Sequence, residues 1–342
     1  MMKKVLLLSF AVLAALSVLS CKKKDAVEEA AGPKTHAVVF KSTGNPFGEK
    51  LMDGFEASVK EQNAQVIRRA PDLPTAEAQI QMIEQLIAQK VASITISAND
   101  YDALQPVLTK AMNGGIKIVT ADSSVNPASR SVHINQADTK LIGETLVEAA
   151  FDQAGGSGEI AILSATSQAS NQNAWIAVMQ ETLKQPKYAN LNLVKVAYGD
   201  DLRDKSVSET EGLIMSYPNL KVIVAPTTVG IAAAGKVITD KGLIGKVKIT
   251  GLGLPSEMAE YIDNGACPYM FLWNPIDLGY LAGYAAGALA DGKITGSEGD
   301  GFSGGKLGDY KVIKASDGGT EVILGPPFKF EPSNIAEWKS VY

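Results

Sequence analysis

The feature that most constrains the fold is a regular alternation of short β-rich runs with amphipathic stretches, which starts at Thr35. Apolar residues recur four positions apart over Phe47–Gln62, as on the buried face of a helix. The flanking runs HAVVF and AQVIRR are rich in the residue types that favour strands. Because strand–helix–strand alternation places parallel strands under helices on both faces, we predict an α/β protein.

A second series of the same kind begins at RSVHIN, residues 130–135. Two series in 342 residues predict two doubly wound parallel-sheet domains joined by a hinge of several strands. The hinge is expected near Asn135–Ala137, Trp273–Pro275 and the Gly-rich stretch 299–308. The predicted lobes are 35–136 plus 276–300, and 137–275 plus 301–342.

Helix boundaries follow from capping residues and apolar periodicity. Thr75 is expected to cap a helix that continues through Lys90, and Ser208 with Glu211 forms a capping box. The other predicted helices span 101–112, 138–154, 171–183, 208–217, 231–241, 256–264 and 277–291.

The first residues predict export. Lys3 and Lys4 precede an apolar stretch that ends at Leu19, shorter than the roughly 20 residues of a spanning helix. We therefore predict a signal peptide over 1–20. The motif VLSC resembles a bacterial lipobox, which favours lipidation at Cys21 and a lipidated tether over 21–34. Simple cleavage or no processing remains the alternative.

Few residues could carry catalysis, metal binding or cofactor binding. His36 and His133 are the only histidines. His36 precedes the first predicted strand and His133 alternates with apolar strand residues, so we expect structural roles for both. No Cys/His/carboxylate spacing suggests a metal, and GLGLPS is a weak dinucleotide motif, so we expect no metal and no cofactor. Cys267 is expected to be a small buried residue. Without a basic stripe, nucleic acid is an improbable partner.

Polar side chains follow several predicted strands. Ligands of open α/β sheets bind beyond the carboxyl ends of strands, although turn formation and helix capping are the default roles of such residues. Most of the strand-end residues are uncharged, which favours a neutral, hydroxyl-rich ligand. The strand-end residues are Lys41, Asn99, Asp122, Asn135, Gln136, Ser164, Asn171, Gln172, Thr227, Thr228, Trp273 and Asn274.

The chain resembles a known family in six blocks. Two of them, KSTGNPFGEKLMDGFE (41–56) and TADSSV (120–125), look like periplasmic sugar-binding proteins of the ribose-binding type. Four more resemble the rhamnose-binding proteins of bacterial ABC transporters, whose relatives bind autoinducer-2: SNQNAW, APTTVGIAAAG, TGLGLPSEM and LWNPIDLGYLAGYAAGALADG. The resemblance implies a type I periplasmic binding protein fold and a solute receptor, not an enzyme.

By this resemblance, ligand contacts fall on Lys41, Asp122, Asn171, Gln172, Pro226 and Thr228. Asn171 and Thr228 stand where the autoinducer-2 receptors have an aspartate and an alanine. An amide both donates and accepts hydrogen bonds, which favours a sugar such as L-rhamnose over autoinducer-2. Autoinducer-2 remains the alternative ligand. An exported enzyme that uses Asp122 as acid or base is a further alternative.

Aromatic side chains complete the predicted site. Phe47 and Trp273 are the preferred stacking partners for a deoxy sugar, while Trp175 is as readily a core residue. Asn45 shapes the first turn and can also reach the ligand. The resemblance further implies lobe closure around the ligand, an ABC permease as partner, a monomer, and a location outside the cytoplasm.

Overall fold

The computed structural model describes residues 32–342. The signal peptide and the lipidation at Cys21 therefore lie outside the described residues. Within the described residues, no helix combines the length and the apolar character needed to cross a membrane.

The first lobe is built on a seven-stranded sheet with the order β13-β14-β5-β4-β3-β1-β2. All neighbours pair in parallel except β13 and β14. The strands are β1 (Thr35–Val39), β2 (Gln65–Arg69), β3 (Ser93–Ile96), β4 (Lys117–Ala121), β5 (Val132–Asn135), β13 (Ile313–Lys314) and β14 (Thr320–Ile323).

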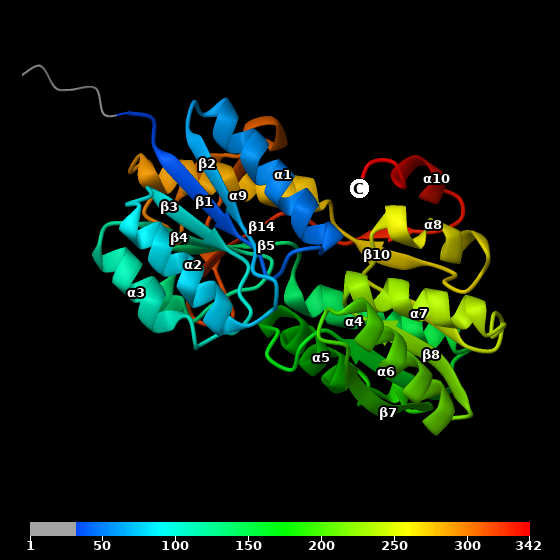
Figure 1. Cartoon of the computed structure of the whole chain (residues 1–342). Coiled ribbons are helices and arrows are strands. Elements are labelled where there is room, and N and C mark those ends of the chain that lie inside the picture. Colours follow the sequence, from blue (N-terminus) through cyan, green and yellow to red (C-terminus); the bar gives the residue numbers. More distant parts are fainter. Residues whose placement is uncertain (1–31) are drawn as a thin grey trace, which may run out of the picture. The chain divides into compact units, whose positions relative to one another are not determined.

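Helices cover both faces of this sheet (Figure 1). One face packs against α1 (Pro46–Glu61) and α9 (Pro275–Ala290), and the other against α2 (Ala76–Ala88) and α3 (Gln105–Asn113). Alternate residues of β1 enter the two cores, since Val38 belongs to the first and Val39 to the second. The first lobe also holds β11 (Gly301–Ser303), β12 (Asp309–Lys311), and the 3-10 turns η1 (Pro127–Ser129) and η3 (Gly305–Leu307).

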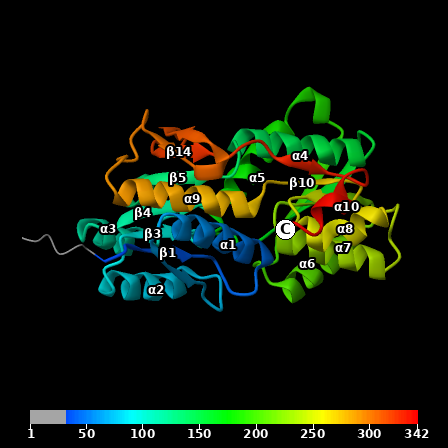
Figure 2. The same ribbon diagram turned by 90° about the horizontal axis from the view of Figure 1, so that it is seen from above.

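The second lobe has a four-stranded parallel sheet, β7-β6-β8-β9, and an antiparallel pair β10-β15 beside β9. Seen from above, α4 and α5 lie on one side of it and α6 and α7 on the other (Figure 2). Its elements are α4 (Thr139–Gln153), β6 (Gly158–Ser164), α5 (Ser170–Thr182), η2 (Pro186–Tyr188), β7 (Leu191–Tyr198), α6 (Arg203–Ser216), β8 (Leu220–Ala225), α7 (Thr228–Asp240), β9 (Lys248–Gly251), α8 (Pro255–Asp263), β10 (Met270–Leu272), β15 (Phe328–Phe330) and α10 (Ile335–Trp338). The prediction of two doubly wound parallel-sheet lobes is confirmed.

The C-terminal part of the chain divides differently from the prediction. We expected all of 301–342 in the second lobe, but β14 pairs with β5 in the first sheet and β11 packs on α9. The cause is the edge of β5, whose backbone groups β14 satisfies in parallel register. The third connecting segment is therefore residues 324–327, between β14 and β15, and the prediction of 299–308 was wrong. The other two connections follow β5 and β10, as predicted.

Three helix starts also differ by three residues or more. Helix α3 begins at Gln105, four residues after the predicted start at 101, with Pro106 in its first turn. Helix α6 begins at Arg203, so Ser208 lies in its interior and its hydroxyl donates to the carbonyl of Asp204. The predicted capping box at Ser208 was wrong. Helix α7 begins at Thr228, where the side chain of Thr227 caps the helix. The predictions for α6 and α7 start too late. The first turn of α6 is polar, and that of α7 holds Gly230, which interrupts the apolar pattern.

Close packing of α1 on α9 depends on glycine. A Cβ added at Gly279 would lie 1.8 Å from the carbonyl oxygen of Leu51, and one added at Gly54 would lie 1.8 Å from that of Ile276. The two backbones therefore touch directly. This contact fixes the start of α1, and with it the residues just before the helix.

Candidate functional site

A buried pocket lies where the strand ends of the two lobes face each other. It is lined from the first lobe by the loop after β1 and the end of β4, and from the second by α5 and the ends of β8 and β10. Ten of the eleven predicted residues line it: Lys41, Asn45, Phe47, Asp122, Asn171, Gln172, Trp175, Pro226, Thr228 and Trp273.

An ion pair lies at the centre of the pocket. Lys41 Nζ is 3.1 Å from Asp122 Oδ2, and both side chains are over 90% buried. Ser97 donates a hydrogen bond of 2.8 Å to the same carboxylate oxygen. Asp122 has φ +65°, a conformation that aspartate tolerates better than most residues. The pair is therefore held in place by neighbours and contributes no net charge to the pocket.

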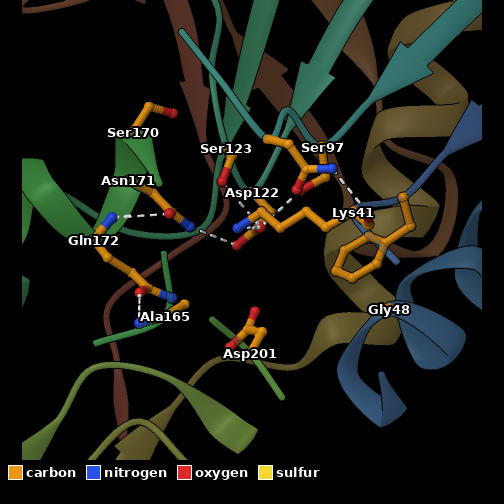
Figure 3. Close-up of polar contacts among 12 residues, drawn as sticks. Lys41, Gly48, Ser97, Asp122, Ser123, Ala165, Ser170, Asn171, Gln172 and Asp201 are labelled. Carbon is orange, nitrogen blue, oxygen red and sulfur yellow. Dashed lines mark hydrogen bonds and ion pairs between the residues drawn. The ribbon is translucent and has the colours of Figure 1, made fainter. Parts of the chain in front are cut away.

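Asn171 connects the two lobes. Its Nδ2 donates to Asp122 Oδ1 across 3.0 Å, and its Oδ1 accepts from the backbone N–H of Gln172. Figure 3 shows Lys41 and Asn171 converging on the Asp122 carboxylate. A second bond between the lobes runs from the Ser170 hydroxyl to the carbonyl of Ser124, at 2.9 Å.

Gln172 offers less to a ligand than we expected. Its Oε1 already accepts from the Ser164 hydroxyl and the Ala165 backbone N–H, both at 2.8 Å. We expected paired donors and acceptors from this amide, but only its NH₂ group is directed to other partners. The Ser164 and Ala165 bonds fix the orientation of that group.

Three aromatic side chains form one wall. The rings of Phe47 and Trp175 both pack edge-on to Trp273, with centroids 6.3 Å and 5.8 Å away. Trp273 Nε1 is buried and has no hydrogen-bond partner within residues 32–342. A buried indole N–H usually has a partner, and Trp273 lines the pocket, so this donor is a candidate contact for a molecule bound there.

Asp201 and Thr227 also line the pocket, and the predicted site omitted both. The Thr227 hydroxyl donates to Asp201 Oδ1 at 2.5 Å. Burial raises the pKa of Asp201, and the nearby charge of Lys41 opposes the rise. Asp201 follows β7, so the strand-end rule that selected Asp122 could have found it.

Asn274 does not line this pocket. Its side chain caps α9, where Oδ1 accepts from the backbone N–H groups of Ile276 and Asp277. The cap directs the oxygen of Asn274 into the helix, so the structure does not bring this residue together with the other predicted ligand residues, and a ligand contact at this position stays a prediction. Asn45 likewise caps α1 through Gly48 N–H, but it also borders the pocket.

The histidines and Cys267 have structural surroundings. Burial lowers the pKa of His36 and of His133 to about 4, and each ring nitrogen Nδ1 is hydrogen-bonded, to Ser93 and to Thr120. Cys267 is free and fully buried, and burial raises the pKa of its thiol. The structural interpretation of these three residues is confirmed. No group of three or more potential metal ligands occurs within residues 32–342.

Comparison with known proteins agrees with this architecture. Residues 36–294 match the periplasmic binding protein domain. The chain belongs to this family. Its fold is the type I periplasmic binding protein fold, as the sequence resemblance implied.

Three relatives of this family illustrate the range. An ABC transporter solute-binding protein from Clostridium phytofermentas, solved with bound L-rhamnose, is 52% identical, with TM-score 0.89 over 91% of this chain and 99% of that one. LsrB from Clostridium saccharobutylicum, in complex with AI-2, is 21% identical, with TM-score 0.84 over 89% and 99%. The D-ribose/D-allose-binding protein of Pseudomonas aeruginosa is 25% identical over 63% of this chain and 69% of its own length.

Proposed function

We propose that the protein is the solute-binding lipoprotein of a sugar ABC importer and binds L-rhamnose, or a similar small deoxy sugar, between its lobes. The observation that carries the proposal is the pocket itself. It combines a neutralised ion pair, amide donors and an aromatic wall in one buried space. This chemistry suits a neutral molecule with hydroxyl groups and one apolar face.

Electrostatics favour a neutral ligand. The charges of Lys41 and Asp122 cancel, and burial raises the pKa of Asp201, which disfavours a further negative charge. A charged ligand would have to lose its hydration in a pocket without a matching counter-charge. Sugar hydroxyls instead donate to Asp122 and accept from Lys41, Gln172 and the Trp273 N–H.

The relative solved with L-rhamnose supports this choice of sugar, because its identity of 52% extends over nearly its whole chain. Asn171 supports it as well. An aspartate at position 171 would bring a second carboxylate to the place where Asn171 Nδ2 lies 3.0 Å from Asp122. Two carboxylates this close repel each other unless a ligand donates between them. The asparagine removes the need for such a donor-rich ligand.

Binding is coupled to movement of the lobes. The free volume of the pocket is about 30 Å³, room for two or three water molecules, so a sugar enters only after the lobes separate. Contacts to both lobes then favour closure, which Asn171–Asp122 and Ser170–Ser124 complete. A shift from 1:99 to 99:1 closed requires about 5.5 kcal/mol of preference for the closed state.

The remaining parts of the proposal follow from this role. The closed form presents both lobes to an ABC permease, and a lipid on Cys21 keeps the monomeric protein at the outer face of the membrane. The protein performs no chemistry on the sugar, in keeping with a family of binding proteins.

Isothermal titration tests the function. We expect one-to-one binding of L-rhamnose, and weaker or no binding of D-ribose and autoinducer-2. Asn171→Ala should weaken L-rhamnose binding at least 10-fold. Asn173→Ala, on the same helix but outside the pocket, is the matched control and should change it less than 2-fold. If only autoinducer-2 binds, the protein is an autoinducer-2 receptor and L-rhamnose is the wrong ligand. If none of the three molecules binds, the proposed function is refuted.

A further inference from the structure

A second cavity lies between the lobes on the far side of the Asn171–Asp122 bond. The two cavities share Asp122, Asn171 and Trp175 as a common wall. The second one, here called the outer chamber, has a free volume of about 150 Å³. It extends from the segment that joins β5 to α4 to lining residues that are exposed, namely Ala174 on α5 and Ser316 and Asp317 before β14. It is therefore larger than the first pocket.

The outer chamber contains polar atoms without partners. Gln136 is 1% exposed, yet neither its Oε1 nor its Nε2 has a hydrogen-bond partner within residues 32–342. The Nε of Arg130, a residue that is 5% exposed, is also unpaired. Leaving a buried donor or acceptor unpaired destabilises the folded protein, because the group has lost its bonds to water without replacement. One acceptor and two donors therefore await partners around the same space.

The charges around the chamber largely compensate one another. Arg130 pairs with Asp317 at 2.8 Å, and Asp122 pairs with Lys41 at 3.1 Å. His133 is held neutral by burial. Glu321 accepts from Asn135 Nδ2 at 2.8 Å, and burial raises its pKa. Among the described residues that line the chamber, none is an unpaired cation, which argues against phosphorylated or acidic ligands.

We propose that the outer chamber binds a second neutral, hydroxyl-bearing group, held by Gln136 and the Arg130 Nε–H. The inference rests on the proposed function, because the first pocket holds the deoxy sugar. Two sources supply this chemistry. The group is the second residue of a rhamnose-terminated disaccharide, reached when Asn171 turns aside, or it is a separate sugar molecule.

Titration of the purified protein with L-rhamnose and with an L-rhamnosyl-glucose disaccharide distinguishes these sources. One disaccharide per chain, bound at least as tightly as L-rhamnose, identifies the linked source. A second, weaker equivalent of L-rhamnose, bound after the one-to-one complex has formed, identifies the separate source. The measured quantity is the affinity ratio between the ligand group in the outer chamber, carried by the disaccharide or by the second L-rhamnose, and L-rhamnose in the first pocket. With either source, Gln136→Ala should lower this ratio about 10-fold. Gln153→Ala, which removes a buried glutamine far from both cavities, should leave that ratio unchanged.

Ala174→Trp provides a second test if Gln136→Ala does not fold. Ala174 is exposed, lines the chamber and does not line the first pocket, so the added indole takes up space in the chamber without entering the first pocket. The proposal is overturned if one L-rhamnose binds per chain and the disaccharide binds at least 10-fold more weakly. An affinity ratio unchanged by both variants would also overturn it and leave ordered water as the occupant. Loss of L-rhamnose binding in the unmodified protein would overturn the proposed function as well.

Discussion

The ion pair at the centre of the pocket yields a quantitative prediction. Asp122→Asn removes the charge that balances Lys41, whose side chain is 7% exposed. Breaking a buried pair from one side costs about 3–5 kcal/mol, because the remaining ion stays buried without compensation. Asparagine tolerates the φ of +65° at this position, so backbone strain adds little. We expect the free energy of unfolding to fall by about 3–5 kcal/mol.

Substitution of Lys41, the other member of the ion pair, should lower the free energy of unfolding by less than Asp122→Asn does. Lys41→Met leaves Asp122 with donors from Ser97 and Asn171, which still stabilise the carboxylate. The double variant leaves no unbalanced charge, so its loss should be smaller than the sum of the single losses. We expect a coupling of about 1.5–3 kcal/mol.

Urea denaturation followed by tryptophan fluorescence measures all four proteins. Lys41 and Asp122 both belong to the first lobe, so their interaction is present whether the lobes are open or closed. Additive losses, within about 0.5 kcal/mol, would refute the reasoning, since they would mean that the two charges do not compensate each other. Titration of the double variant with L-rhamnose should show no binding even where its stability is retained.

Three further predictions concern the scaffold. In the folded protein the pKa of His36 and of His133 is about 4, below the value of 6.5 in the unfolded chain. The free energy of unfolding should therefore fall by up to about 3 kcal/mol per histidine as the pH drops from 6.5 to 4. Urea midpoints that do not change with pH would contradict this. Gly279→Ala should lower the free energy of unfolding by about 1–3 kcal/mol, because the added Cβ forces α1 and α9 apart. Gly212→Ala, with open space around it, should raise that free energy by up to about 1 kcal/mol through a more stable α6. Thermal unfolding compares the two variants, and equal effects would contradict the packing argument. Asn274→Ala should cost about 1 kcal/mol through loss of the cap and leave L-rhamnose affinity within 2-fold; a larger loss of affinity would restore its predicted ligand role.

Much of the fold follows from the sequence because strand and helix periods leave a regular signal. Strand ends were readable for the same reason, and Lys41 and Asp122 meet as that rule implies. The placement of residues 301–323 in the first lobe, and not in the second, could not be predicted from the sequence. It depends on which sheet edge remains free, and that is a property of the assembled lobes rather than of the short strands β13 and β14.

Within the site, the prediction of ligand contacts was limited because some polar side chains already form hydrogen bonds within the protein. Asn274 and Asp201 both follow strands, yet one caps a helix while the other lines the pocket. The choice depends on where the next helix starts. Similarly, the oxygen of Gln172 is used by Ser164 and Ala165, a pairing that requires β6 and α5 to be in contact. Such commitments become visible only in three dimensions.

The most direct test of the account is a crystal structure of the protein with L-rhamnose. The account predicts one sugar between the lobes, with hydroxyl groups on Lys41 and Asp122 and its apolar face on the wall formed by Phe47 and Trp273. It also predicts a wider pocket than the present 30 Å³ and a hydrogen bond from Trp273 Nε1. A sugar bound elsewhere, or an empty pocket in crystals grown with saturating L-rhamnose, would contradict it.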